Sequence, residues 1–378
     1  MIKASLIVIV CLGAVVGVGV LSGWSIPGKS LATSDSTGLG GGQVADPATD
    51  TVNGAGDQQK KDVDLSLQAS AAGEPAINFA KATEESAARN RFDLTRAGDG
   101  AGRVLQGAVA IEETNALYTM QQNTAGKSMV INKFDLSGDK KQTASRFSEP
   151  SDLLGHQGLT VDYISGSPRF WTSANADVKS AADYAVRFSV TEDGARGLLI
   201  GDYQRFKLFD RAAGDGSSTP AVSLDGRYLV VKQTGSKSDT SIIRVFDLEA
   251  LVNGGAGDYA TGFHLSEFTI GSEILDADQP VQALASDGSY IYVVTGFGKN
   301  GIDNRIAKYS MLGDLVSAKL DFTVGNTVSL EDGTGKKNEP EGLFWMRDQG
   351  VTRLALAMSS GNADAHRARI YYLDTNKP

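Results

Sequence analysis

A strand pattern that recurs at long, regular intervals constrains the fold of this chain more than any other feature. Pro220, Pro280 and Pro340 open three similar units, and these prolines lie sixty residues apart. Each unit contains an apolar run, a turn, a second strand-like run, a polar loop and a third alternating strand. Two earlier units of the same design begin at Val104 and Gly155. Repeats of this size with several strands are typical of the blades of a β-propeller.

The turns inside the units support β-hairpins. Asp225-Gly226 and Asp287-Gly288 each separate two apolar runs, and Asp-Gly between such runs is a strong hairpin signal. Helical periodicity is scarce, and residues 248–252 are expected to form a single helical turn. This disfavours a helical solenoid, because its repeats need the 3.6-residue period.

We predict an all-β fold, a five-bladed β-propeller over residues 104–378. The C-terminal segment is expected to pair with the strands that begin at Val104 and so to close the ring, because open sheet edges need protection. A β-sandwich is the alternative fold. The repeated Asp-Gly hairpins favour the propeller.

The N-terminal residues 1–32 predict a signal peptide or a membrane anchor. Residues 4–24 contain no charge and follow Lys3, and this run of 21 residues is long enough to span a bilayer as a helix. Ser30 and Ala32 are small residues at suitable positions for cleavage after Ala32. Both outcomes predict an exported, extracytoplasmic protein, periplasmic or secreted. An uncleaved segment would anchor it in the cytoplasmic membrane.

Two further segments precede the propeller. Residues 33–60 are rich in Gly, Ser, Thr and Asp and have few large apolar side chains, which predicts a disordered, flexible linker. Residues 61–103 are expected to form an N-terminal arm. Within it, residues 62–91 are expected to hold one helix or to remain a loose arm.

Composition excludes several classes of protein. The net charge of −9 argues against nucleic acid as the main partner. The single Cys cannot form an intramolecular disulfide, and one Cys with three His leaves little material for a Cys/His metal site. No metal and no cofactor is predicted.

Short motifs in the later units carry a resemblance to a known family. They are PAVSLDGRYLVV, IIRVFDLEALVNG, PVQALASDGSYIYVV, EPEGL and RIYYLD, together with the GHQG motif at residues 155–158. In these motifs the chain resembles the helveticin J family, which is similar to the teichoic acid biosynthesis protein C group. The resemblance covers about 270 residues. It implies a five-bladed propeller on secreted or envelope-facing bacterial proteins, some with bacteriocin activity and some associated with wall teichoic acid.

The candidate ligand site lies where each unit begins, because the first strand of a blade lines the channel and ligands bind at its mouth. Amide, imidazole and carboxylate groups there suit sugar hydroxyls. The candidates are Gln106, His156, Gln157, Gln282 and Glu341. Arg169 and Trp171 would add a cation and a stacking face. The alternative is that these polar groups bond to the backbone and lock the blades together.

We therefore predict a non-enzymatic propeller that binds a cell-envelope glycan or an envelope protein. One alternative is a bacteriocin-like antagonist of the helveticin J type. Another is a glycan-active hydrolase, because a glycosidase needs two carboxylates about 5–10 Å apart across the scissile bond. Asp162 and Glu341 are the one conceivable pair, with His156 nearby.

Overall fold

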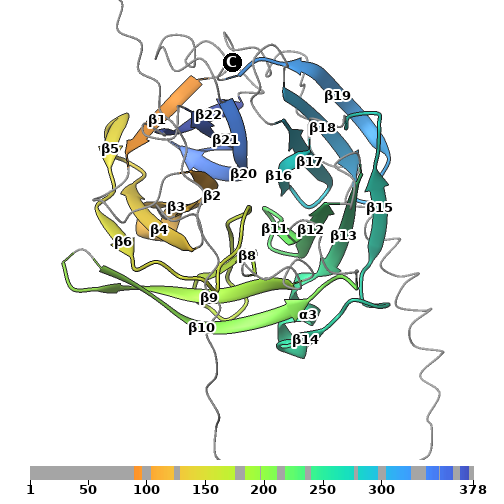
Figure 1. Ribbon diagram of the computed structural model, residues 1–378, viewed down its shortest axis with the longest axis horizontal. Coiled ribbons are helices and arrows are strands. Elements are labelled where there is room, and N and C mark those ends of the chain that lie inside the picture. The colour runs from red at the N-terminus through yellow and green to blue at the C-terminus, as the bar shows by residue number, and fades with distance from the viewer. Residues whose placement is uncertain are drawn as a thin grey trace, which may run out of the picture. The chain divides into compact units, whose positions relative to one another are not determined.

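The computed structural model describes residues 89–95, 104–122, 128–174, 184–195, 197–210, 218–234, 240–275, 280–296, 304–324, 338–348, 350–360 and 367–373. Most of these residues lie in β-strands, and the described part of the chain has one α-helix, α3 (Leu248–Gly254). The strands form blades around a common centre, as Figure 1 shows. The predicted all-β propeller is confirmed.

The first four blades follow the chain order, and each has four antiparallel strands from the centre outward. Blade one consists of β2 (Leu105–Ile111), β3 (Ala116–Gln122), β4 (Met129–Asp135) and β6 (Arg146–Ser148). Blade two consists of β7 (Thr160–Asp162), β8 (Arg169–Ser173), β9 (Tyr184–Asp193) and β10 (Gly197–Lys207). Blade three consists of β11 (Ser218–Val222), β12 (Tyr228–Thr234), β13 (Ser241–Asp247) and β15 (Ser266–Ile270). Blade four consists of β16 (Val281–Ser286), β17 (Tyr290–Thr295), β18 (Asn304–Ser310) and β19 (Leu315–Phe322).

Blade five joins the two ends of the propeller. It consists of β20 (Asn338–Asp348), β21 (Val351–Ser360), β22 (Arg367–Leu373) and β1 (Arg89–Thr95), and the short strand β5 (Lys141–Thr143) pairs parallel with the outer edge of β1. β1 pairs antiparallel with β22, with Phe92 opposite Ile370 and Leu94 opposite Ala368. Figure 1 shows β1 beside β22 although they lie at opposite ends of the described chain.

The expected mode of ring closure is therefore wrong. β22 pairs with β21 and β1, and not with the strands that begin at Val104. The physical reason is the position of β22 in its blade. Its inner edge is occupied by β21, so its outer edge is the one that can accept a strand from another part of the chain. β2 is the innermost strand of blade one and bonds to β3.

Each pair of neighbouring blades shares one apolar cluster. Side chains alternate across a strand, so a blade contributes one set of residues to each of its two interfaces. On β22, Ile370 and Tyr372 pack in the cluster with blade one, whereas Tyr371 and Leu373 pack in the cluster with blade four. Three further clusters fill the remaining interfaces. The core of this protein is thus a ring of five interfaces.

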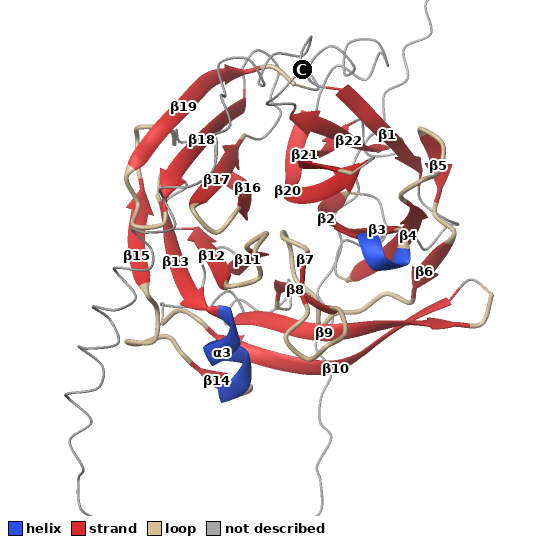
Figure 2. Ribbon diagram, turned by 180° about the vertical axis from the view of Figure 1, so that it is seen from behind, coloured by secondary structure: helices blue, strands red, loops and turns tan. Residues whose placement is uncertain are grey.

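The hairpin turns form as the sequence predicts. Gly226 and Gly288 have φ angles of 71° and 95°, a conformation that glycine adopts without strain. Asp225 and Asp287 accept hydrogen bonds from backbone N–H groups within these turns. The expected helical turn after residue 247 is α3, whose first turn is capped by the Asp247 carboxylate 2.8 Å from Ala250 N. Figure 2 shows α3 at the outer side of the ring.

The predicted signal or anchor, residues 1–32, and the predicted linker, residues 33–60, lie outside the described residues. Of the predicted arm, residues 61–103, the structure describes β1, which belongs to blade five. Within the described ranges no helix combines the length and the apolar character needed to cross a membrane.

Candidate functional site

The predicted residues at the starts of the inner strands meet near the centre of the ring. Gln106 lies on β2 and is buried, and His156 lies in the loop before β7. His156 Nδ1 is 3.2 Å from Gln106 Oε1 and 2.8 Å from Gln122 Nε2 on β3. This nitrogen donates to Gln106 or accepts from Gln122, depending on the tautomer. These contacts link blade one to the loop that leads into blade two.

A second chain of contacts joins four blades. The Gln157 amide donates to Gln282 Oε1 on β16, and the Gln282 amide donates to Glu339 Oε1 on β20 at 2.7 Å. Lys232 Nζ, on β12, donates to Gln157 Oε1 at 3.0 Å and to the Val281 carbonyl at 2.9 Å. Blades two, three, four and five are thereby connected through side chains that lie far apart in the sequence.

Lys232 is fully buried at the centre of this network. Burial lowers the pKa of its ammonium group to about 7, and the nearby Glu341 carboxylate partly opposes this effect. Glu341 lies on β20 and is itself only 2 % exposed. With a pKa of about 7, both the charged and the neutral form of the amine are populated near neutral pH, and either form donates to both acceptors.

The local backbone supports these contacts. Gln157 has a φ of 66° and is followed by Gly158 with a φ of 78°. A Cβ on Gly158 would lie 2.7 Å from the Thr219 side chain at the start of blade three, so the close approach of the two blades requires glycine here. Ser173 of β8 also donates a hydrogen bond to the His156 carbonyl.

This arrangement explains what five of the predicted residues do. Gln106, His156, Gln157 and Gln282 bond to residues of other blades or of the same central network, and Glu341 acts electrostatically on Lys232. The contacts link blades, as the alternative to ligand binding expects, but most partners of these groups are side chains and not the backbone. We use the name central lock for these five residues together with their partners Gln122, Lys232 and Glu339.

The sequence-based candidates did not include Lys232 and Glu339. A signal for Lys232 was present, since it is a charged residue at the end of the apolar run Tyr228-Leu229-Val230-Val231 and within a predicted inner hairpin. A lysine buried at such a position needs polar partners. Which partners meet it depends on residues 75 and 49 positions away along the chain.

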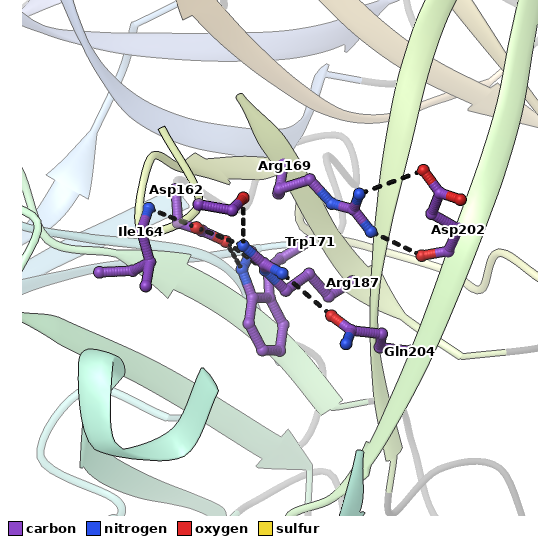
Figure 3. A network of polar contacts seen from close by, with 8 residues as sticks. Asp162, Ile164, Arg169, Trp171, Arg187, Asp202 and Gln204 are labelled. Atoms are coloured by element: carbon purple, nitrogen blue, oxygen red, sulfur yellow. Dashed lines mark hydrogen bonds and ion pairs between the residues drawn. The ribbon is translucent and has the colours of Figure 1, made fainter. Parts of the chain in front are cut away.

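Trp171, Arg169 and Asp162 lie in blade two, as Figure 3 shows. Trp171 has no exposed surface and packs against Phe206, so the expectation that its ring stacks on a sugar is wrong. Arg169 forms an ion pair with Asp202, with 3.2 Å between Nη1 and Oδ2, and donates to the Asp202 carbonyl at 2.7 Å. Arg169 and Asp202 thus connect β8 to β10 within blade two.

The Asp162 carboxylate is fully engaged by donors. Arg187 Nε and Nη2 lie 2.7 and 2.8 Å from its two oxygens, and Trp171 Nε1 lies 2.6 Å from Oδ2. The Ile164 N–H also donates to it at 3.0 Å. Both oxygens of this buried carboxylate accept from donors of the protein, whereas general acid or nucleophilic catalysis needs a group that can reach a substrate.

A cavity of about 440 Å³ lies toward the other ends of the inner strands. Its walls contain the last residues of β2, β7, β11 and β16 and the middle of β20. Tyr163 and Leu224 line it and are 42 % and 51 % exposed, so the cavity opens to solvent. None of the predicted ligand residues lines this cavity, and of the predicted carboxylate pair it contains only Asp162.

Among the described residues, no group of three or more His, Cys, Asp and Glu side chains is arranged to hold a metal ion.

Comparisons with known proteins extend these observations. Residues 104–372 match the model of a family described as the phage five-bladed β-propeller receptor-binding platform domain. No curated protein sequence matches the chain. The comparisons support the propeller that the sequence motifs implied, and the resemblance to the helveticin J family stays a prediction.

Solved structures are similar to this chain at low sequence identity. The tail fibre of Staphylococcus aureus phage P68 is 18 % identical with a TM-score of 0.47, over 75 % of this chain and 52 % of that chain. An exo-β-1,3-galactanase from Phanerochaete chrysosporium is 10 % identical with a TM-score of 0.44, over 72 % of this chain and 60 % of that chain. The present chain thus spans about half to three-fifths of the length of these two proteins.

Proposed function

Because the chain belongs to the family of phage five-bladed β-propeller receptor-binding platform domains, we propose that it binds a glycan of a bacterial cell envelope. The observation that carries this proposal is the family match, which extends over residues 104–372. A receptor-binding propeller of a phage meets its ligand at a bacterial surface. For the present protein we propose an exported location, which would bring the propeller to such a surface.

The proposed activity is binding without catalysis. Asp162, one member of the conceivable hydrolase pair, is buried and bonded to Arg187, Trp171 and Ile164. A glycosidase needs two carboxylates that face the scissile bond from opposite sides. The engagement of Asp162 therefore favours a binding module over the hydrolase alternative.

An envelope-binding experiment tests the proposal. The purified full chain is incubated with isolated bacterial envelopes, before and after chemical removal of their glycans. Bound protein and released reducing sugar are measured in the same tube. We expect binding that depends on the glycans, without release of sugar.

Each other outcome contradicts part of the proposal. Equal binding to both preparations would indicate an envelope protein as the partner, and absence of binding to both would overturn the glycan proposal. Release of sugar that requires Glu341 would establish the hydrolase alternative. Growth inhibition of bacteria by the pure protein would instead support the bacteriocin-like alternative.

A further inference from the structure

The cavity at the carboxyl ends of the inner strands carries an acidic rim. Glu112 and Glu113, in the 3-10 turn η1 (Glu112–Thr114) that follows β2, both line it and are both exposed. Among the described residues that line the cavity there is no Lys and no Arg. Asp162 also borders the cavity, but Arg187 compensates its charge. The residues that line the cavity therefore carry a net negative formal charge, which comes from the two rim glutamates.

One of these glutamates is held in a defined position. The Tyr163 hydroxyl donates to Glu113 Oε2 at 2.9 Å. Partial burial of the phenol, together with this hydrogen bond and the charge of Glu113, raises the pKa of Tyr163, which therefore stays a neutral donor. The second carboxylate oxygen of Glu113 and the face of the Tyr163 ring remain as features that a ligand can contact.

Aromatic and aliphatic groups line the interior of the cavity. Trp345, on β20, is half-buried, and its orientation is fixed because Nε1 donates to the Ser286 carbonyl at 2.8 Å. Tyr292 packs edge-on against the same ring, with centroids 5.6 Å apart. Thr160 supplies a hydroxyl group, which accepts from the Val222 N–H at 3.1 Å and can still donate to a ligand. An aromatic surface beside carboxylates and hydroxyls suits a sugar, and it also favours a cation near the ring.

We propose that this cavity is the ligand site of the propeller and that it binds a sugar bearing a protonated amine. The proposal rests on the proposed function and identifies the site and the charge of its ligand. The sugar ring contacts the aromatic and apolar wall, and the ammonium group lies against Glu113. The central lock, formed at the opposite ends of the same strands, holds the inner strands that make up the wall.

Glu113 is a better test position than Glu112. A second cavity, of about 520 Å³, also contains Glu112, and it is lined by Arg91 and Arg347. These arginines reduce the charge that Glu112 presents to a ligand. Glu113 lines the acidic cavity and does not line the second one.

The test uses a glucosamine tetramer and its N-acetylated counterpart as probes, with the full-length protein in isothermal titration at about pH 6, where amines are protonated. We expect the glucosamine tetramer to bind at least about tenfold more tightly than the acetylated one, as for a charge-assisted contact. Glu113→Gln should weaken binding of the glucosamine tetramer about tenfold and leave binding of the acetylated tetramer unchanged. Glu249→Gln, an exposed glutamate on α3 outside the cavity, is the matched control and should bind like the wild type.

The outcomes separate this inference from the proposed function. Equal affinity for the two tetramers, or unchanged affinity in Glu113→Gln, would overturn the cationic-sugar site. If the wild type binds envelopes through their glycans but not the glucosamine tetramer, the inference fails and the proposed function stands. If it binds neither envelopes nor tetramer, both fail. Tyr163→Phe provides a second variant that keeps the ring, and we expect it to weaken binding of the glucosamine tetramer because Glu113 is no longer positioned.

Discussion

Replacement of Lys232 by methionine tests the electrostatics of the central lock. Methionine keeps an unbranched, apolar side chain in the buried position and removes the amine that donates to Gln157 and to the Val281 carbonyl. It also removes an ionisable group whose pKa in the folded protein is about 7, against an ordinary value of 10.5. The substitution should therefore change how stability depends on pH.

The direction follows from proton linkage. As the pH rises above 7, the folded protein releases the Lys232 proton, whereas the unfolded chain keeps it until the pH approaches 10.5. The unfolded state thus binds more protons, and the free energy of unfolding rises with pH in this interval. For a pKa that falls from 10.5 to about 7, the rise between pH 7 and pH 9.5 is about 3 kcal/mol. Lys232 contributes least to the free energy of unfolding below pH 7, where the buried amine is charged.

Urea unfolding followed by tryptophan fluorescence at pH 7, 8 and 9.5 measures this effect. The difference in unfolding free energy between wild type and Lys232→Met should grow by about 3 kcal/mol over the range, because other titrating groups cancel in the comparison. The matched control is Lys140→Met, since Lys140 is exposed. If the difference between wild type and Lys232→Met stays constant with pH, the assignment of Lys232 as a buried amine with a lowered pKa is refuted.

Two further substitutions test the contacts that shape the blades. Asp162→Asn leaves the buried Arg187 guanidinium without its carboxylate partner and should destabilise the protein by about 3–5 kcal/mol in chemical denaturation; a loss under about 1 kcal/mol would contradict the role of this ion pair. Phe92→Ala removes a fully buried ring from the closing strand β1 and should cost about 3–5 kcal/mol, whereas Leu199→Ala, at a half-exposed position, should cost under about 0.5 kcal/mol. Equal effects of Phe92→Ala and Leu199→Ala in the same assay would argue against β1 as an integral strand of blade five.

The candidate site was only partly predictable. The place of a polar residue at the start of a unit predicts that it lies near the centre of the ring. The structure brings four such residues into the central lock: Gln106, His156, Gln157 and Gln282. Their partners do not follow from the sequence, because Lys232 and the amide it meets are separated by 75 residues. Trp171 was assigned to the ligand because tryptophan stacks on sugars, but its ring is completely buried.

No local sequence pattern indicates the cavity that Glu113 and Trp345 line. Glu113 and Trp345 lie in different blades, and neither occurs in a motif with characteristic spacing. They share one cavity because blade one and blade five are neighbours in the closed ring. A cavity of this kind is a property of the assembled blades.

The sequence by itself determined the local features of this protein. Alternating apolar residues and Asp-Gly turns dictate hairpins, because strand periodicity and turn conformation depend on residues next to one another. The regular spacing of these hairpins determined that the chain forms repeated blades. Only the tertiary structure decided that β1 closes the ring beside β22, that Lys232 meets Gln157, and that Glu113 shares a cavity with Trp345. The physical reason is that each of these contacts joins residues far apart in the chain, which meet only after the blades have packed around a common centre.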